Sequence, residues 1–217
     1  MTDILNINKY KHFFLDYDGL IADTEKLYFE TWCQVLTKKG QEICRDFHEG
    51  KHQSEVYEKV KHFLLKKMTL EEVSEYRKST YDKYIVQGRL GLIDGMWDFL
   101  KALNDKAPLS IVSNSTEDVV ENGIKTLRIE KYFDNLFCFD DTLNRKPAPD
   151  IYNLAISALN LDRSSVLAFE DSISGILAAQ SAGIPVICIN SSPQMAVHCK
   201  KNNIRYYKSS KKILLDA

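Results

Sequence analysis

Two aspartates one residue apart, Asp16 and Asp18, follow an apolar run at residues 12–15 and precede Gly19. Side chains alternate along a β-strand, so residues i and i+2 point the same way and the two carboxylates leave the strand side by side. Carboxylates that close repel each other, and a divalent cation or a proton held by one of them relieves the repulsion. The pattern indicates either an acidic active site or an Asp-rich turn, since aspartate and glycine are ordinary turn residues.

Polar groups also stand at the ends of other apolar runs. Ser113-Asn114-Ser115 follows the run at 109–112, Glu170-Asp171 follows the run at 166–169, and Lys146 precedes a proline-initiated helix. In an open parallel sheet, ligands bind at the carboxyl ends of the strands. We therefore expect these groups to converge with the two aspartates at one site.

The short apolar runs alternate with helical patterns along most of the chain. Near-continuous apolar character is typical of strands that are buried on both faces of a parallel sheet. The expected strands lie at residues 12–15, 109–112, 136–139, 166–169 and 185–189, and the helices between them at 95–104, 117–127, 149–159, 173–182 and 193–201. This alternation predicts an α/β fold with a Rossmann-like parallel sheet core.

About ninety residues separate the first expected strand from the second, far more than one crossover connection requires. They carry helical patterns at 24–39, 54–66 and 70–87 and no strand pattern. We expect an inserted α-helical cap domain at residues 24–92, hinged at Ala22-Asp23 and at 88–91, with residues 1–23 and 93–217 forming the core. The lysine-rich stretch at 208–212 is expected to be a solvated last helix or strand.

The composition excludes several classes of partner. Lys plus Arg number 29 and Asp plus Glu number 30, so the formal net charge of −1 leaves no electrostatic footprint for nucleic acid or an anionic membrane. No apolar run approaches the ~18 to 20 residues that cross a bilayer, and the N-terminus has no signal-peptide pattern. The five cysteines include no C-x-x-C pair and are expected to be reduced thiols. We expect a monomeric cytoplasmic protein that binds a small molecule.

The chain resembles the haloacid dehalogenase superfamily of phosphotransferases, in the branch with a helical cap after the first strand that includes β-phosphoglucomutase. The resemblance spans nearly the whole chain, in the order of the family. It is carried by four elements and their flanking residues: Asp16-Tyr17-Asp18-Gly19 with Asp23-Thr24-Glu25, Ser113-Asn114-Ser115, Lys146-Pro147-Ala148-Pro149-Asp150, and Phe169-Glu170-Asp171-Ser172 with Gly175.

This resemblance implies a phosphotransferase that uses Mg²⁺, held by the carboxylates of Asp16 and Asp171 and the backbone carbonyl of Asp18. Asp16 is the implied nucleophile, which forms an aspartyl-phosphate, and Asp18 the implied general acid and base. Ser113 and Lys146 are the implied phosphate contacts. Mg²⁺ suits such a site because it prefers oxygen ligands and because phosphate-ester charge must be neutralised before an anion attacks.

Several assignments keep an alternative. Lys146 by itself also fits an exposed lysine before a helix. Ser113 and Ser115 also fit caps of the helix that begins near residue 117, a role for which we favour Ser115 or Thr116. Glu170 is either a direct metal ligand or, as we favour, an outer-shell group that orients a metal-bound water. Asn114 either contacts phosphate or holds the loop.

Asp18 and two positions of the cap distinguish between the activities that occur in this family. Dehalogenases and phosphonate-cleaving relatives lack the second aspartate, which Asp18 supplies here. A mutase of this family has a histidine twelve residues after the nucleophile and an arginine three residues after a cap glycine; those positions hold Tyr28 and, aligned on Gly50, Gln53. We therefore predict a Mg²⁺-dependent phosphatase of a small, sugar-phosphate-like ester, with a hexose-phosphate mutase and an idle phosphometabolite-binding protein as alternatives. The candidate specificity residues are Tyr28, Lys51, His52 and Gln53, with Lys59 as a further cation.

Overall fold

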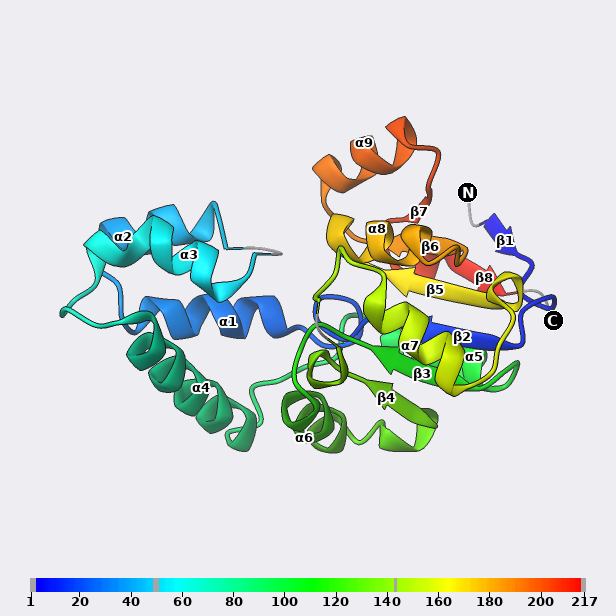
Figure 1. The fold of residues 1–217 in the computed structure, drawn as a ribbon, viewed down its shortest axis with the longest axis horizontal. Helices are drawn as coiled ribbons and strands as arrows, with labels where there is room; N and C mark the ends of the chain where they lie inside the picture. Colours follow the sequence, from blue (N-terminus) through cyan, green and yellow to red (C-terminus); the bar gives the residue numbers. More distant parts are fainter. Residues whose placement is uncertain (1–2, 49–50, 143, 216–217) are drawn as a thin grey trace. The chain divides into compact units, whose positions relative to one another are not determined.

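A six-stranded parallel sheet forms the centre of the core unit in the computed structural model, which describes residues 3–48, 51–142 and 144–215 (Figure 1). The strand order is β4-β3-β2-β5-β6-β7. The strands are β2 (His12–Leu15), β3 (Leu109–Val112), β4 (Asn135–Phe137), β5 (Val166–Glu170), β6 (Val186–Ile189) and β7 (Arg205–Tyr207). A separate two-stranded parallel sheet pairs β1 (Asp3–Leu5) with β8 (Ile213–Leu215). The predicted Rossmann-like α/β core is confirmed.

Helices cover both faces of the six-stranded sheet. The helices α5 (Met96–Asn104) and α6 (Glu117–Leu127) lead from β2 through β3 to β4, while α7 (Asp150–Ala158), α8 (Ile173–Ser181) and α9 (Pro193–Lys201) lead through β5 and β6 to β7. Right-handed crossovers in opposite directions along a sheet place their helices on opposite faces. The direction reverses between β2 and β5, and ligands of open α/β sheets bind at such a switch point.

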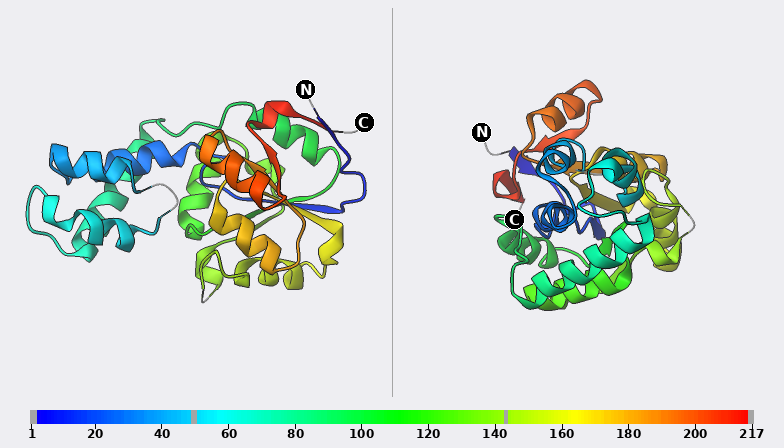
Figure 2. Two further views of the ribbon diagram at one scale, coloured as in Figure 1. Left: turned by 90° about the horizontal axis from the view of Figure 1, so that it is seen from above. Right: turned by 90° about the vertical axis from the view of Figure 1, so that its left-hand side faces the viewer.

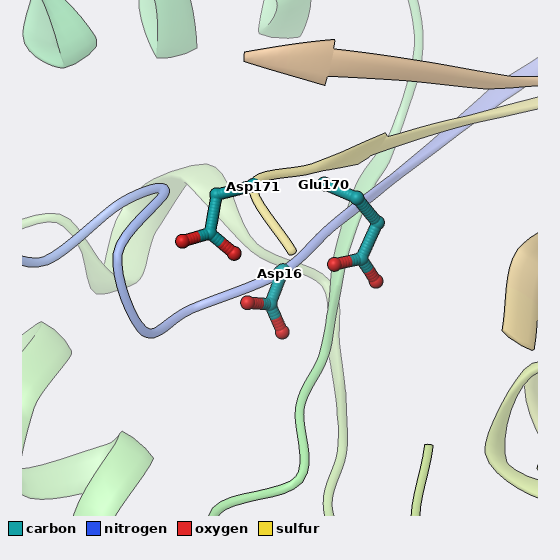
Figure 3. A group of neighbouring side chains, drawn as sticks. All are labelled: Asp16, Glu170 and Asp171. Carbon is teal, nitrogen blue, oxygen red and sulfur yellow. The ribbon is translucent and has the colours of Figure 1, made fainter. Parts of the chain in front are cut away.

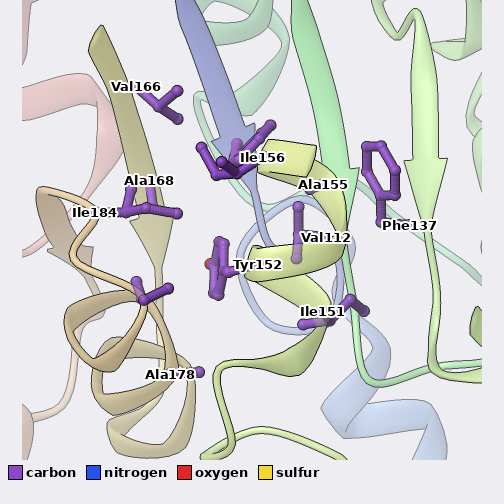
Figure 4. Close-up of a cluster of buried hydrophobic side chains, with 13 residues drawn as sticks. Val112, Phe137, Ile151, Tyr152, Ala155, Ile156, Val166, Ala168, Ala178 and Ile184 are labelled. Atoms are coloured by element: carbon purple, nitrogen blue, oxygen red, sulfur yellow. The ribbon is translucent and has the colours of Figure 1, made fainter. Parts of the chain in front are cut away.

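Apolar side chains hold these layers together. On the face of α7 and α8, alternate residues of the strands, Phe14, Val112 and Ala168, are buried against Tyr152 and other side chains of the helices (Figure 4). On the opposite face, the rings of Phe99 in α5 and Phe169 in β5 meet edge to face, with 5.2 Å between centroids. All four residues of β2 are buried, so the chain immediately before Asp16 has little freedom to move.

The second compact unit spans residues 23–91, and the core unit comprises residues 1–22 and 92–217. Figure 2 gives two further views of its helices, α1 (Thr24–Cys33), α2 (Lys38–Arg45), α3 (Gln53–Val60) and α4 (Leu70–Val86). Their apolar faces meet in a cluster of their own that includes Trp32, Leu36, Val56 and Val73. We refer to this helical unit as the cap.

The single helix expected at residues 24–39 is wrong, because the chain breaks between α1 and α2. The side-chain amide of Gln41 donates to the backbone carbonyls of Cys33 and Leu36, both at 3.0 Å, and so satisfies one carbonyl at the end of α1 and one in the connection to α2. The Thr37 hydroxyl then accepts from the backbone of Gly40 and starts α2. These local hydrogen bonds outweigh a hydrophobic period that continues through the break.

Three shorter elements also differ from expectation. The strand expected at 136–139 runs from Asn135 to Phe137 and gives way to a 3₁₀ turn, Phe139–Asp141. The helix expected at 54–66 ends at Val60 and continues as the 3₁₀ turn Lys61–Phe63. The lysine-rich stretch near the C-terminus holds the 3₁₀ turn Ser210–Lys212.

All five cysteines are free thiols. In the described part of the chain, no helix combines the length and the apolar character that crossing a membrane requires.

Candidate active site

Three carboxyl groups meet where β2 and β5 end, at the switch point of the sheet. Asp16 directly follows β2, Glu170 is the last residue of β5, and Asp171 follows it. Figure 3 shows the three side chains beside one another. One oxygen from each lies within 4.8 Å of one from each of the others. The backbone N–H of Asp16 donates to the Phe169 carbonyl at 3.1 Å, which extends the pairing of the two strands into the site. The sheet therefore fixes the backbone positions of all three acids.

Lys146 lies among these acids and is almost inaccessible, with 3% of its side chain exposed. Its Nζ donates to Asp16 Oδ1 at 2.8 Å, to Glu170 Oε1 at 2.6 Å and to the backbone carbonyl of Val112 at 2.7 Å. The structure thus places Lys146 in the interior, against the alternative of an exposed lysine before α7. An ammonium with three fixed acceptors is a well-oriented point charge.

Burial and charge shift the pKa values of this group. Burial raises the pKa of the Asp16 carboxyl to about 8. The positive charge of Lys146 opposes this shift, but the carboxylates of Glu170 and Asp18 add to it. For Lys146, burial alone would lower the pKa, but Asp16 and Glu170 outweigh it and raise the pKa of the ammonium. One ammonium therefore stays charged but does not neutralise all the acids around it.

Tyr152 in α7 is a member of this network that the sequence did not single out. Its hydroxyl donates to Glu170 Oε1 at 2.5 Å, and the whole side chain is buried. The second Glu170 oxygen, Oε2, is buried without a hydrogen-bond partner among the described residues. It packs against Gly175, where an added Cβ would lie 1.8 Å from it. The Glu170 carboxylate therefore requires the glycine beside it and is held mainly through Oε1.

The donor set fits a hard divalent cation. The site offers only oxygen ligands, and its acids outnumber its cations. Two of its carboxylate oxygens, Asp18 Oδ1 and Glu170 Oε2, are buried without a hydrogen-bond partner among the described residues. Gly19 is part of the same arrangement, because its φ of +74° favours glycine and an added Cβ would lie 2.2 Å from Asp171 Oδ2. These residues can hold a metal ion without rearrangement of the strands.

Asp18 lies among hydroxyl groups that follow β3. Ser115 Oγ donates to Asp18 Oδ2 at 2.6 Å, and Ser113 Oγ lies 3.4 Å from the same oxygen. Of the residues expected to cap α6, Thr116 is the N-cap residue and neither serine is, while Asp140 accepts from the backbone N–H of Glu117. Both serines instead face the second aspartate.

Asn114 holds the loop that carries Lys146. Its Oδ1 accepts from the backbone N–H of Lys146 at 2.8 Å, and its Nδ2 donates to the Lys146 carbonyl at 3.3 Å. Asn190, which the sequence did not single out, acts in the same way beside Asp171: its Nδ2 donates to the backbone carbonyl of Asp171 at 2.8 Å. Two amide side chains therefore fix the main chain on either side of the acids.

The candidate specificity residues of the cap differ in how far they are buried and in what they contact. Lys51 and His52 are exposed at the start of α3, where Lys51 lies 3.8 Å from Glu55 and the His52 ring caps the helix. Tyr28 stacks on Tyr81 with 5.0 Å between ring centroids. Gln53 is half-buried and accepts from an arginine of α4. Gly50, on which the alignment of Gln53 depends, lies outside the described residues.

The signals for the missed residues are weak in the sequence. Tyr152 fits one more apolar position of α7, and Asn190 is a polar residue after a strand like many others. The role of each depends on which strands and helices become neighbours in the fold.

Comparison with known proteins agrees with this geometry. The family model described as haloacid dehalogenase-like hydrolase matches residues 13–189. The phosphorylated carbohydrates phosphatase of Thermotoga maritima is 34% identical over 176 residues, which cover 78% of this chain and 80% of that protein. The validoxylamine A 7'-phosphate phosphatase of Streptomyces hygroscopicus is 29% identical over 182 residues, covering 81% and 83% of the two chains.

A solved structure shares the fold over almost its whole length. The HAD hydrolase of family IA, variant 3, from Entamoeba histolytica has a TM-score of 0.75 and 23% identity, and the match covers 94% of this chain and 95% of that one. The sequence matches and the sheet-edge arrangement lead to the same assignment. The chain belongs to the haloacid dehalogenase-like hydrolase family.

Proposed function

We propose that this protein is a Mg²⁺-dependent phosphatase that hydrolyses a small phosphomonoester through an aspartyl-phosphate on Asp16. Residues 1–23 and 93–217 are the catalytic core in this proposal, and residues 24–92 are the cap that selects the substrate. The names of the two phosphatase relatives support a phosphorylated sugar or a similar metabolite as the substrate class.

One observation carries the proposal: the Lys146 ammonium holds Asp16, after β2, and Glu170, at the end of β5, together. A buried lysine between two acids is costly to desolvate, and a purely structural site of this kind is often no more stable than an apolar one. A site for a doubly charged phosphate needs this arrangement, because the nucleophile must be fixed and the approaching anion must meet positive charge.

Asp16 acts as the nucleophile in the first step. Its Oδ1 is held by Lys146, which leaves the other carboxylate oxygen to attack phosphorus. The P–O bond to the leaving group breaks as the bond to Asp16 forms. Lys146, Ser113 and Asn114 are the proposed phosphate contacts, and Lys146 offsets the charge that the phosphoryl oxygens bring.

Asp18 moves the protons. It protonates the leaving oxygen in the first step, and as a carboxylate it then takes a proton from the water that attacks the phosphoenzyme. Ser115 donates to one of its oxygens and so orients the carboxyl group for both steps. The products are the alcohol and inorganic phosphate, and Asp16 returns to its starting state.

Asp16, Asp171 and the backbone carbonyl of Asp18 would hold Mg²⁺, with Glu170 acting from the outer shell. When bound, Mg²⁺ neutralises charge on the phosphate and on the clustered acids. Glu170 Oε1 already accepts from Lys146 and Tyr152, which supports an outer-shell role for this residue.

We expect Asp171→Asn to weaken Mg²⁺ activation more than Glu170→Gln. The first change removes a charged ligand, and the second leaves the ligand set intact but disturbs its support, for which a loss of about 10- to 100-fold in metal affinity is typical. The measurement is the Mg²⁺ concentration for half-maximal phosphate release from an aryl phosphate. Asp150→Asn, an acid of α7 outside the carboxyl cluster, is the matched control. Equal shifts in the two site variants would show that Glu170 binds the metal directly.

Water, and not a sugar hydroxyl, is the expected acceptor of the phosphoryl group. A mutase must retain its phosphoenzyme while a bisphosphorylated intermediate turns, which requires a closed site that excludes water. Neutral Gln53 and Tyr28 stand where the mutase pattern has an arginine and a histidine. Incubation with β-glucose 1-phosphate and a trace of the 1,6-bisphosphate should therefore release phosphate without efficient formation of glucose 6-phosphate.

The outcomes separate the alternatives. Rapid isomerisation with little free phosphate would establish a mutase instead. No turnover of an aryl phosphate with or without Mg²⁺, by protein that is folded, would establish a binding protein. A panel of phosphorylated metabolites, assayed for phosphate release, then ranks substrates for the phosphatase.

A further inference from the structure

Arg145, the residue before Lys146, connects two segments of the active site and has no part in the catalytic proposal. Its Nη1 donates to the backbone carbonyl of Asn114 at 2.6 Å. Its guanidinium lies over the ring of Phe139, with 3.5 Å between the guanidinium carbon and the ring centroid. Arg145 is half-buried, and all these residues belong to the core unit. The contacts therefore do not depend on where the cap lies.

The two segments that Arg145 joins carry the groups proposed to contact phosphate. Residues 113–115, which follow β3, carry Ser113 and the hydroxyl that donates to Asp18. The other segment carries Lys146, whose ammonium contacts the nucleophile. A site of this kind must hold its donors to within about 0.5 Å of the productive geometry. A shift of one segment against the other would change the distance between the hydroxyl groups and the ammonium, and so would disturb that geometry.

Both contacts of the guanidinium lead to the segment after β3. The backbone N–H of Phe139 donates to the Ser115 carbonyl at 3.0 Å, so the ring and the carbonyl that Arg145 contacts belong to one hydrogen-bonded unit. The side chain of Asn114 adds two hydrogen bonds to the main chain of Lys146. A planar guanidinium on a ring face has few orientations open to it. Arg145 therefore restricts how the two segments can move against each other.

We propose that Arg145 is a positioning residue of the phosphate site, which fixes the spacing between the hydroxyl groups after β3 and the Lys146 ammonium through the main chain of Asn114. Arg145 acts through these groups and does not contact the substrate. The inference rests on the proposed function and assigns one more residue to the same reaction. Precise spacing matters most in the transition state, so loss of Arg145 should lower kcat and leave KM nearly unchanged.

The test compares Arg145→Met with Arg163→Met. Arg163 is a matched control, because its Nη1 also donates to a backbone carbonyl, that of Ala182, but it lies before β5, at the opposite end of that strand from Glu170. Phosphate release from an aryl phosphate gives kcat and KM, and urea unfolding gives the stability of each variant. We expect Arg145→Met to lower kcat about 10- to 100-fold and to change KM less than about 3-fold, as a small displacement of reacting groups predicts. Arg163→Met should leave kcat unchanged.

Two further variants make the result specific and decide it if Arg145→Met does not fold. Arg145→Lys keeps the charge without the planar fork, and Phe139→Leu removes the ring beneath it. Both should lower kcat, and adding Phe139→Leu to Arg145→Met should have little further effect, because the two residues act as one unit. Wild-type kcat in Arg145→Lys would show that charge alone matters and would overturn the inference. A raised KM with unchanged kcat in Arg145→Met would also overturn it, since it would indicate direct substrate binding.

Binding of two anions separates this inference from the proposed function. Vanadate adopts the shape of a phosphoryl group in its transition state, so with Mg²⁺ present the wild-type protein should bind it more tightly than inorganic phosphate. Arg145→Met should lower this preference by about the same factor as kcat, and Arg163→Met should not. If the wild-type protein hydrolyses no ester but Arg145→Met still lowers the preference, the proposed function fails and the positioning role stands. If esters are hydrolysed and the two variants have the same kcat and the same preference, the positioning role fails alone.

Discussion

Asp16→Asn is expected to reduce phosphate release by about 10⁴-fold or more while the protein stays folded, because the amide removes the nucleophile that the mechanism requires. Asn has nearly the same shape as Asp, and Asp16 is fixed by backbone pairing to Phe169 and by packing around β2. The change also lowers the charge of the cluster and so removes part of the attraction for a metal ion. Phosphate release and far-ultraviolet circular dichroism measure the two parts of this expectation.

The second aspartate provides the control for this experiment. Asp18→Asn should also be severely impaired, but it retains the nucleophile and should accumulate some phosphoenzyme when the ester has a good leaving group. Mass spectrometry of acid-quenched protein distinguishes the two variants, because only Asp18→Asn should carry a phosphoryl group. If Asp16→Asn kept more than a few per cent of the wild-type rate, the covalent mechanism would be wrong.

The core was predictable from the sequence because its strands are apolar on both faces. The runs at 12–15, 109–112 and 166–169 match β2, β3 and β5 to within one residue. These are the buried central strands, where the pattern has no competing interpretation. The edge strand β7 was not predicted, because only one of its three residues, Tyr207, is buried.

The candidate site was predictable only as far as strand ends define it. Asp16 follows β2, Glu170 ends β5 and Asp171 comes next, so the pairing of these parallel strands brings the three acids together. Tyr152 lies inside a helix instead, and it gains its role from a partner in another element, Glu170. Hydrophobic period alone gives this position a packing role.

Lys146→Met is expected to lower both activity and stability. The methionine fills a similar volume but leaves Asp16 and Glu170 without the ammonium that each contacts at 2.8 and 2.6 Å. Removing one member of a buried ion pair costs about 3 to 5 kcal/mol in unfolding free energy. Loss of a fixed donor at the reacting group costs about 10²- to 10³-fold in kcat. Urea unfolding and steady-state phosphate release measure these two effects.

A metal ion should restore part of the lost stability, because Mg²⁺ at the same carboxylates replaces positive charge that the variant lacks. The difference in unfolding free energy between wild type and Lys146→Met should therefore be larger without Mg²⁺ than with it. Lys125→Met is the matched control: Lys125 is 60% exposed and pairs with Glu121 on α6, so its removal should change the unfolding free energy by about 0.5 kcal/mol or less. If Lys146→Met changed it no more than Lys125→Met, the ammonium would not hold the acids together, and the fixed nucleophile on which the mechanism depends would need another source.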